Sequence, residues 1–214
     1  FPLQSEPEAT VLAFAPFFSN QIALVETVAK AIPIDTLLYV KEHPTQKDKS
    51  WRSVKDYKKI INIPNVRLIH PSVNSLELVE KSEGIITISG STGFEALFYK
   101  KPVIIFGDEH YEDLPMVTKI TKIGNLAQEI KTALTKYRFD EDELNIFMEV
   151  FNKQSLHIRY SNIMKEGVLL SAIQRNGENF QLTDKYFQNY VSKYNEDFKL
   201  IASTVLKRIK ENVQ

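Results

Sequence analysis

Residues 84–106 read GIITISGSTGFEALFYKKPVIIF, in which an apolar run, a small polar turn, an amphipathic stretch and a second apolar run follow one another. The apolar runs predict buried strands over residues 84–88 and 103–106, and the stretch between them predicts a helix over residues 93–99. A strand, a crossover helix and a second strand form the repeating unit of a parallel sheet. The segment therefore predicts an α/β fold, a Rossmann-like parallel sheet with helices on both faces.

The same alternation extends toward the N-terminus. Apolar runs predict three further strands, over residues 10–15, 36–41 and 66–69. Helical periodicity and polar caps predict three helices. The first runs from Ser19 or Asn20 to about residue 31, and the second covers residues 52–61. The third covers residues 74–81 and begins with a capping box formed by Asn74 and Glu77. Ligands of such sheets bind beyond the carboxyl ends of the strands, so the site is expected there.

The C-terminal part has a different, helical pattern. Leu126, Ile130 and Leu134 recur at helical spacing, and residues 140–154 and 179–213 also predict helices. We therefore expect two parts: a Rossmann-like core over residues 1–124 and a mainly helical extension over residues 125–214.

The composition excludes several classes of protein. The chain of 214 residues has no cysteine, which excludes disulfides, thiolate metal sites and a cysteine nucleophile. Basic and acidic residues number 27 each, so no overall field attracts nucleic acid, and we expect no nucleic-acid partner. No apolar run approaches the roughly 20 residues that cross a bilayer, and the opening residues lack the features of a signal peptide. We expect a cytoplasmic protein, and the absence of an initiator methionine suggests a fragment of a longer chain.

The first candidate site is Lys41-Glu42-His43-Pro44, at the end of a predicted strand. Alternation along an extended chain places Lys41 and His43 on one side, and Pro44 keeps the His43 backbone extended. A cation beside an imidazole suits a phosphate group. The alternative is a solvated lysine and a histidine that only ends a strand. A second His-Pro pair, His70-Pro71, lacks a lysine two residues before the histidine, so we favour the first.

The second candidate site is the turn and helix start over residues 89–97, SGSTGFEAL. Two glycines allow a tight turn, and the free amides of a helix start, with two hydroxyls, form an anion site. The alternative is a capping box between Thr92 and Glu95, which explains both residues by helix stability alone. The segment is neither a P-loop nor a G-x-G-x-x-G fingerprint.

A third region, residues 106–111, follows the next strand and either lines the same pocket or forms an ordinary polar loop. Its acidic and histidine side chains crowd one loop without a helical histidine pair, so solvated loop charge is favoured over a metal site. The side chains in question are Asp108, Glu109, His110, Glu112 and Asp113.

Taken in order, several segments resemble the capsule polysaccharide biosynthesis family that includes the bacterial Kdo transferases. The resemblance covers roughly residues 1–112 and rests on FPLQSEPEA, Gln21 ahead of a helix, VKEHP, LIHPSVNSLELVEKS, ITISGSTGFEAL, KKPVIIFG and Tyr111. It implies the C-terminal, donor-binding lobe of a two-lobed GT-B glycosyltransferase that makes capsule or surface polysaccharide.

The resemblance also implies the site. His43-Pro44 and Ser91-Thr92 contact the phosphate and ribose of a CMP-linked acid sugar such as CMP-Kdo, and Lys41 adds positive charge. An acceptor hydroxyl attacks the anomeric carbon while His43 stabilises the departing phosphate. No metal or other cofactor is expected, since the donor carries one phosphate. The expected site residues are His43 in catalysis, and Lys41, Glu42, Pro44, Ser91, Thr92, Gly93, Glu95 and Gln21 in substrate binding.

Members of this family take the acceptor surface and the base from an N-terminal lobe, so the resemblance implies that this chain carries only the donor-binding half of the active site. The expected partners are the nucleotide-sugar donor, a glycan or glycolipid acceptor and the N-terminal lobe, with the full enzyme peripheral at the inner face of the cell membrane. Two other hypotheses about the function stay open. One is another GT-B-like enzyme, such as a teichoic-acid-type glycerophosphotransferase or a UDP-sugar epimerase; the other is a non-catalytic domain that binds a partner protein.

Overall fold

The computed structural model describes residues 1–6, 9–46, 51–175 and 184–212. These residues form two compact units, Phe1–Phe147 and Met148–Gln214, which are described separately. The first unit continues past the predicted boundary at residue 124, because the helix that follows packs against the core of the first unit.

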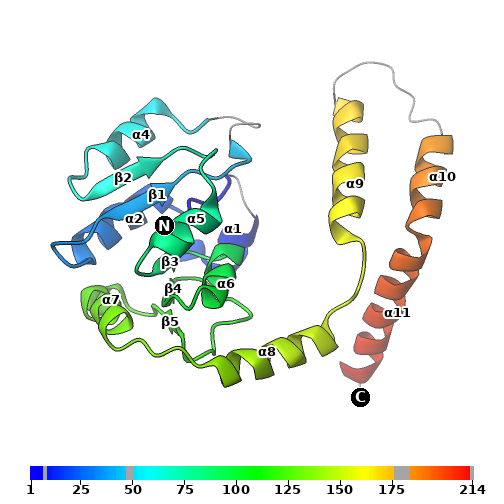
Figure 1. The fold of residues 1–214 in the computed structure, drawn as a ribbon. Coiled ribbons are helices and arrows are strands. Elements are labelled where there is room, and N and C mark those ends of the chain that lie inside the picture. Colours follow the sequence, from blue (N-terminus) through cyan, green and yellow to red (C-terminus); the bar gives the residue numbers. More distant parts are fainter. Residues whose placement is uncertain (7–8, 47–50, 176–183, 213–214) are drawn as a thin grey trace. The chain divides into compact units, whose positions relative to one another are not determined.

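The first unit contains parallel strands, as the sequence predicts (Figure 1). β1 (Leu38–Lys41) pairs with β2 (Val66–Ile69). β4 (Val103–Ile105) pairs with β3 (Ile85–Thr87) on one side and with β5 (Val117–Lys119) on the other. The sequence did not predict β5, because a half-buried V-T-K triplet carries little strand signal.

The predicted strand over residues 10–15 is wrong, and the first extended segment lies earlier. Residues 1–4, which we call the N-terminal segment, run parallel to β1: the Leu3 N–H donates to the Lys41 carbonyl at 2.8 Å, and the Lys41 N–H donates to the Phe1 carbonyl at 2.9 Å. The side chain of Gln4, the last residue of this segment, donates to the Ser89 carbonyl at 2.7 Å. The backbone hydrogen bonds form two separate sheets, and the Gln4 side chain links them, so that the segments follow one another in the order β2, β1, N-terminal segment, β3, β4, β5.

Residues that were expected to form the first strand form α1 (Ala9–Phe14) instead. Val11 and Ala15, four residues apart, are buried, whereas Leu12 is 60% exposed. That is the burial pattern of a helix face, and a short apolar run cannot by itself distinguish a strand from a helix.

The predicted helices are confirmed, with caps that follow from the sequence. Each of α2 (Gln21–Ala31), α4 (Val54–Ile61) and α5 (Ser75–Lys81) begins after a polar residue whose side chain accepts a first-turn N–H, as N-caps do. These caps are Asn20, Ser53 and Asn74. The capping box predicted at α5 does not form, because Asn74 accepts the Leu76 N–H in place of the Glu77 N–H, and the Glu77 carboxylate pairs with Lys81 at 2.7 Å.

Two groups of helices flank the strands. α2 contacts α4 and α7 (Leu126–Thr135), while α5 contacts α6 (Ser91–Phe98), which packs on β3 and β4. The main core lies between the strands and the group of α2, α4 and α7, and it is apolar and buried; its members include Leu3, Val25, Val28, Val40, Ile60, Ile88 and Ile130. Burying one such side chain stabilises the fold by about 1.5–3 kcal/mol. The loops at the carboxyl ends of the strands therefore stand on a rigid base.

The remaining elements of the first unit are short turns and one helix. The 3-10 turns η1 (Pro16–Phe18) and η2 (Ile123–Asn125) precede α2 and α7, and α8 (Glu141–Gln154) begins near the end of the unit. The helices α7 and α8 agree with the predicted helical pattern.

The second unit is helical, with α9 (Tyr160–Arg175), α10 (Asp184–Lys193) and α11 (Asn195–Asn212). Arg159 and Asp197 join its elements through three hydrogen bonds of 2.6–3.0 Å. The helices predicted over residues 179–213 are confirmed where the structure describes them; residues 179–183 and 213 lie outside the described residues. Among the helices of the described residues, none has the length and apolar character that a bilayer span requires.

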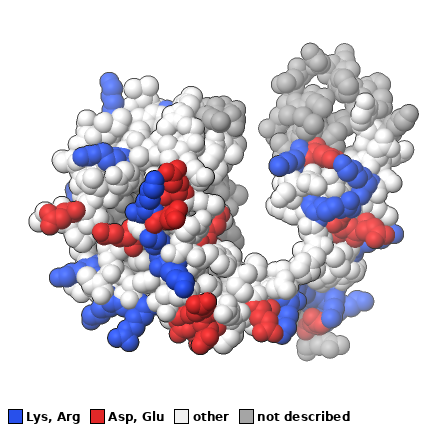
Figure 2. Space-filling view, viewed as in Figure 1, with Lys and Arg blue, Asp and Glu red and all other residues white. Residues whose placement is uncertain are grey.

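The surface carries both signs of charge, interspersed on the viewed face of each unit (Figure 2). Several exposed pairs follow helical spacing, such as Lys153 with Glu149 at 2.6 Å. Exposed pairs of this kind contribute roughly 0.3–0.5 kcal/mol each, so they decide little of the fold.

Candidate functional site

Three loops meet at the carboxyl ends of the strands, where the strand order reverses between the N-terminal segment and β3. They are residues 5–6, residues 42–46 after β1, and residues 89–92 after β3, which we call the Ser89 turn. Thr45 Oγ1 and Ser5 Oγ lie 3.4 Å apart, and Gln4 reaches the Ser89 carbonyl. In parallel α/β sheets this reversal point is the usual place for a ligand.

His43 forms a compact turn with Thr45, which we call the His43 turn (residues 43–45). The His43 Nδ1 atom lies 2.8 Å from Thr45 Oγ1 and accepts the Thr45 N–H at 3.3 Å. Since Nδ1 accepts the Thr45 N–H, we assign a ring proton to Nε2, which makes Nε2 a hydrogen-bond donor.

The second His-Pro pair forms a matching turn, the His70 turn (residues 70–72), at the end of β2. Its Nδ1 lies 2.7 Å from Ser72 Oγ and accepts the Ser72 N–H at 3.2 Å. The His70 ring packs near Trp51, with 6.0 Å between ring centroids. The two turns thus have the same local geometry, and only the His43 turn touches Ser5 beside the Ser89 turn.

Lys41 is buried, and its ammonium group donates to the Pro71 carbonyl at 3.2 Å. Burial lowers the pKa of Lys41, while the charge of Glu42 opposes that shift. The structure therefore connects Lys41 to the loop after β2.

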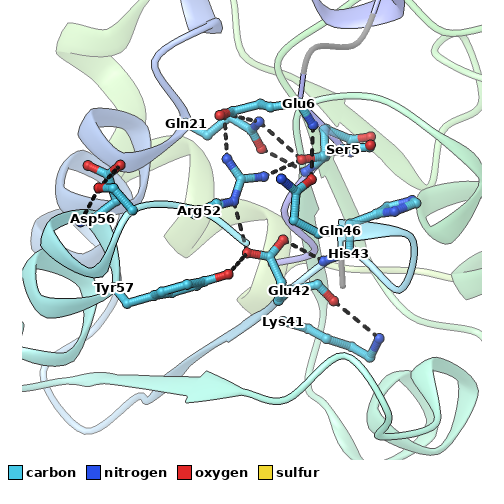
Figure 3. A network of polar contacts seen from close by, with 12 residues as sticks. Ser5, Glu6, Gln21, Lys41, Glu42, His43, Gln46, Arg52, Asp56 and Tyr57 are labelled. Atoms are coloured by element: carbon cyan, nitrogen blue, oxygen red, sulfur yellow. Dashed lines mark hydrogen bonds and ion pairs between the residues drawn. The ribbon is translucent and has the colours of Figure 1, made fainter. Parts of the chain in front are cut away.

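Glu42 lies in a buried polar network that Figure 3 shows from close by. Its carboxylate accepts hydrogen bonds from Arg52 Nε at 2.9 Å, from the Tyr57 hydroxyl at 2.8 Å and from the His43 N–H at 2.7 Å. Burial, with the hydrogen bond to Glu42, raises the pKa of Tyr57 to about 12. Glu42, expected to bind substrate, is instead surrounded by partners from the protein itself.

Arg52 extends this network to the loop after the N-terminal segment. Its guanidinium donates to the Gln4 carbonyl and pairs with Glu6 (Figure 3). Gln21, also expected to bind substrate, accepts the Gln4 N–H at 2.7 Å and donates to Glu6 at 2.7 Å. The role of Arg52 could not be predicted from the sequence, because its partners lie 10 and 46 or more residues away along the chain.

The Ser89 turn leads directly into α6, which begins at Ser91 with Gly90 as its N-cap and without a side-chain cap. Thr92 is therefore inside the helix, and the alternative explanation of Thr92 and Glu95 as a capping box does not hold. The Gly90 φ of 105° is a conformation that glycine adopts readily and other residues avoid. The first N–H groups of a helix have no acceptor within the helix, so this end offers hydrogen-bond donors to an anion.

The loop after β4 holds the Ser89 turn in place. The Tyr111 hydroxyl donates to the Gly90 carbonyl at 2.9 Å, and the Glu109 carboxylate accepts the Gly90 N–H. Burial, followed by the charge of Glu109, raises the pKa of Tyr111. A Cβ atom on Gly93 would collide with the Tyr111 hydroxyl, so Gly93 permits this contact. The third candidate region thus contacts the second.

Other charges of that loop are paired with Lys119, which lies 2.6 Å from Asp108 and 2.8 Å from Glu112. Within the part of the chain that the structure describes, no group of three or more histidine and acidic side chains is arranged to hold a metal ion. Glu95 is half-buried on α6.

Comparisons with known proteins find one family and two solved structures. The capsule polysaccharide biosynthesis protein family matches residues 1–140. Among solved structures, KpsC of Thermosulfurimonas dismutans, a beta Kdo 2,7 transferase, is 20% identical with a TM-score of 0.45, and the match covers 72% of this chain and 53% of that one. The glycotransferase of kitacinnamycin is 15% identical with a TM-score of 0.38, over 77% of this chain and 42% of that one.

The chain thus spans about half the length of these solved proteins, with 53% and 42% covered. No curated protein matches it. The family match extends over 140 of the 214 residues and includes the N-terminal segment, the His43 turn and the Ser89 turn, so the chain belongs to the capsule polysaccharide biosynthesis protein family.

Proposed function

We propose that the first unit binds the nucleotide-sugar donor of a glycosyltransferase that makes capsule or surface polysaccharide, and that the donor is a CMP-linked acid sugar such as CMP-Kdo. The observation that carries this proposal is that the loop after the N-terminal segment links the two candidate loops: Ser5 contacts Thr45 of the His43 turn, and Gln4 contacts the Ser89 carbonyl just before α6. One loop supplies an imidazole donor, and the other supplies helix amides beside two hydroxyls.

A buried hydroxyl supports a ligand at the same place. Ser89 is 1% exposed, and its Oγ atom has no hydrogen-bond partner among the described residues. A buried polar group without a partner costs about 1–3 kcal/mol. A phosphate or ribose oxygen bound at the Ser89 turn would provide that partner.

In this mechanism His43 Nε2, the Ser91 and Thr92 hydroxyls and the first amides of α6 hold the single phosphate of the donor. The acceptor hydroxyl oxygen attacks the anomeric carbon, and the bond from that carbon to the phosphate oxygen breaks. The bonding electron pair leaves with CMP, and the acceptor proton passes to a base. Donors aimed at the departing phosphate stabilise the charge that develops there.

The other predicted residues have supporting roles in this proposal. Lys41 adds positive charge behind the site, Pro44 keeps the His43 backbone extended, and Glu95 accepts a hydrogen bond from the ribose or cytidine. Gly93 leaves room for Tyr111. We further propose that no metal takes part, since one phosphate needs less charge compensation than two. The glycan or glycolipid acceptor and the base belong to another lobe, and the complete enzyme associates with the inner face of the membrane.

Calorimetric titration of the chain with CMP, CDP, UMP, UDP and AMP tests the proposal. We expect the cytidine nucleotides to bind more tightly than the others. Tighter binding of UMP or UDP would contradict the CMP-linked donor, and no binding of any nucleotide would contradict the donor site itself.

A further inference from the structure

The two His-Pro turns differ in the residue that precedes the histidine. The His43 turn and the His70 turn have the same ring contacts, with Nδ1 2.8 Å and 2.7 Å from the hydroxyl two residues later. Glu42 precedes the first histidine, and Ile69 precedes the second. A His-Pro turn of this shape therefore forms without a carboxylate before it, and the local turn does not explain Glu42.

Burying the ion pair between Glu42 and Arg52 also costs desolvation free energy. Their side chains are 2% and 3% exposed, so both charges have lost most of their water. Buried ion pairs often contribute little net stability, because desolvation offsets the attraction between the charges. Neither the local turn nor stability accounts for the pair.

The contacts of the pair point to its role. Glu42 receives the His43 N–H at 2.7 Å, and Arg52 holds the same carboxylate at 2.9 Å while it donates to the Gln4 carbonyl. Gln4 in turn donates to the Ser89 carbonyl at 2.7 Å. One chain of contacts thus leads from the His43 backbone to the Ser89 turn, and Figure 3 labels its part from His43 through Glu42 to Arg52.

We propose that Glu42 and Arg52 are positioning residues, which set the distance between His43 and the Ser89 turn so that both reach one phosphate. This inference rests on the proposed donor site. Neither residue touches the ligand: Glu42 acts through the His43 backbone, and Arg52 acts through Glu42 and Gln4. Tyr57, which donates to the same carboxylate at 2.8 Å, supports Glu42 from α4.

The test is the double variant Glu42→Met/Arg52→Met. It removes both charges of the pair together, so it should be more stable than Glu42→Met alone, which leaves the buried Arg52 without Glu42; Lys41 loses the attraction of Glu42 in both variants. CMP should nevertheless bind to the double variant at least tenfold more weakly than to the parent. Ile69→Met, at the matching position before the His70 turn, is the control and should bind CMP like the parent. Parent-like CMP binding by the folded double variant would overturn the proposal.

A second variant and a second measurement cover the case in which the double variant does not fold. Arg52→Lys keeps the charge but cannot hold Glu42, Gln4 and Glu6 together with one planar group. The chain has four histidines, so their imidazole signals can be followed one by one by NMR. We expect Arg52→Lys to shift the His43 signals more than those of His70, whose ring lies near the adjacent Trp51, and to weaken CMP binding. Unchanged His43 signals would overturn the positioning role.

The two proposals fail in different ways. If the parent binds no nucleotide, the donor site is wrong, and the NMR comparison of His43 with His70 still decides whether Glu42 and Arg52 position His43. If the parent binds CMP and the variants bind it equally well, the donor site stands and the positioning role is wrong.

Discussion

Replacing Gly93 by alanine is expected to destabilise the first unit, although alanine is the better helix former. The change relieves the cost of glycine inside a helix, a gain of about 1 kcal/mol. The new Cβ atom, however, would meet the Tyr111 hydroxyl, and would lie 3.2 Å from Tyr111 Cζ and 3.2 Å from a Val103 methyl group. Tyr111 is fully buried, so it has little room to move away.

The expected magnitude follows from three contributions. Overpacking of a buried site costs roughly 1–3 kcal/mol. Displacing the Tyr111 hydroxyl from the Gly90 carbonyl, now 2.9 Å away, loses a hydrogen bond whose net contribution is about 0.5–1.5 kcal/mol. After the helix gain is subtracted, Gly93→Ala should lower the free energy of unfolding by roughly 0.5–3.5 kcal/mol. The Ser89 turn should loosen as well, so CMP binding should weaken.

Urea unfolding of the parent, Gly93→Ala, Tyr111→Phe and the double variant is the assay. Removing the hydroxyl makes room for the methyl group, so Gly93→Ala should cost less in the Tyr111→Phe background than in the parent. Two outcomes would refute the reasoning: a Gly93→Ala protein that is more stable than the parent, or strictly additive effects in the cycle, since residues in contact should couple.

Three further predictions concern the site. His43→Ala should weaken CMP binding by roughly 1.5–3 kcal/mol, the range for hydrogen bonds to charged groups, whereas His70→Ala should change it little; equal losses in calorimetry would mean that the wrong His-Pro pair was chosen. Glu95→Gln should weaken CMP binding without moving the melting temperature, and unchanged binding would remove Glu95 from the site. The pKa of Tyr57 is raised from 10.0 to about 12 in the folded protein, so as the pH rises its hydroxyl loses its proton in the unfolded chain before it does so in the folded one. The free energy of unfolding should therefore fall as the pH rises from 10 toward 12. Tyr57→Phe should lose less stability over that range in urea unfolding.

The fold class could be predicted because its signals are local. The strands of residues 84–106 lie in short apolar runs, and the caps Asn20, Ser53 and Asn74 each act on a backbone N–H two or three residues away. Such contacts form within one turn of chain, so the sequence is enough to place them. The two loops of the candidate site could be predicted for the same reason, since each follows a strand end.

The failures concern contacts that distant segments make. The apolar run at residues 10–15 is equally compatible with a strand and with a helix. It forms a helix because the N-terminal segment already occupies the position beside β1. The capping box at Thr92 and Glu95 satisfies the sequence rule, but α6 begins at Ser91, where Gly90 is held by Glu109 and Tyr111 from the loop after β4.

The sequence by itself thus determined the alternation of helices and strands over residues 19–106 and the two loops that carry the proposed donor site. Only the tertiary structure decided which segment lies between β1 and β3, and that Glu42 and Arg52 join the His43 turn to the N-terminal segment. The physical reason is separation along the chain. Arg52 comes within reach of the Gln4 carbonyl, 48 residues away, only after the sheet has formed. No local sequence pattern predicts such a contact, because burial of the hydrophobic core brings Arg52 and Gln4 together and the residues next to them in the chain do not.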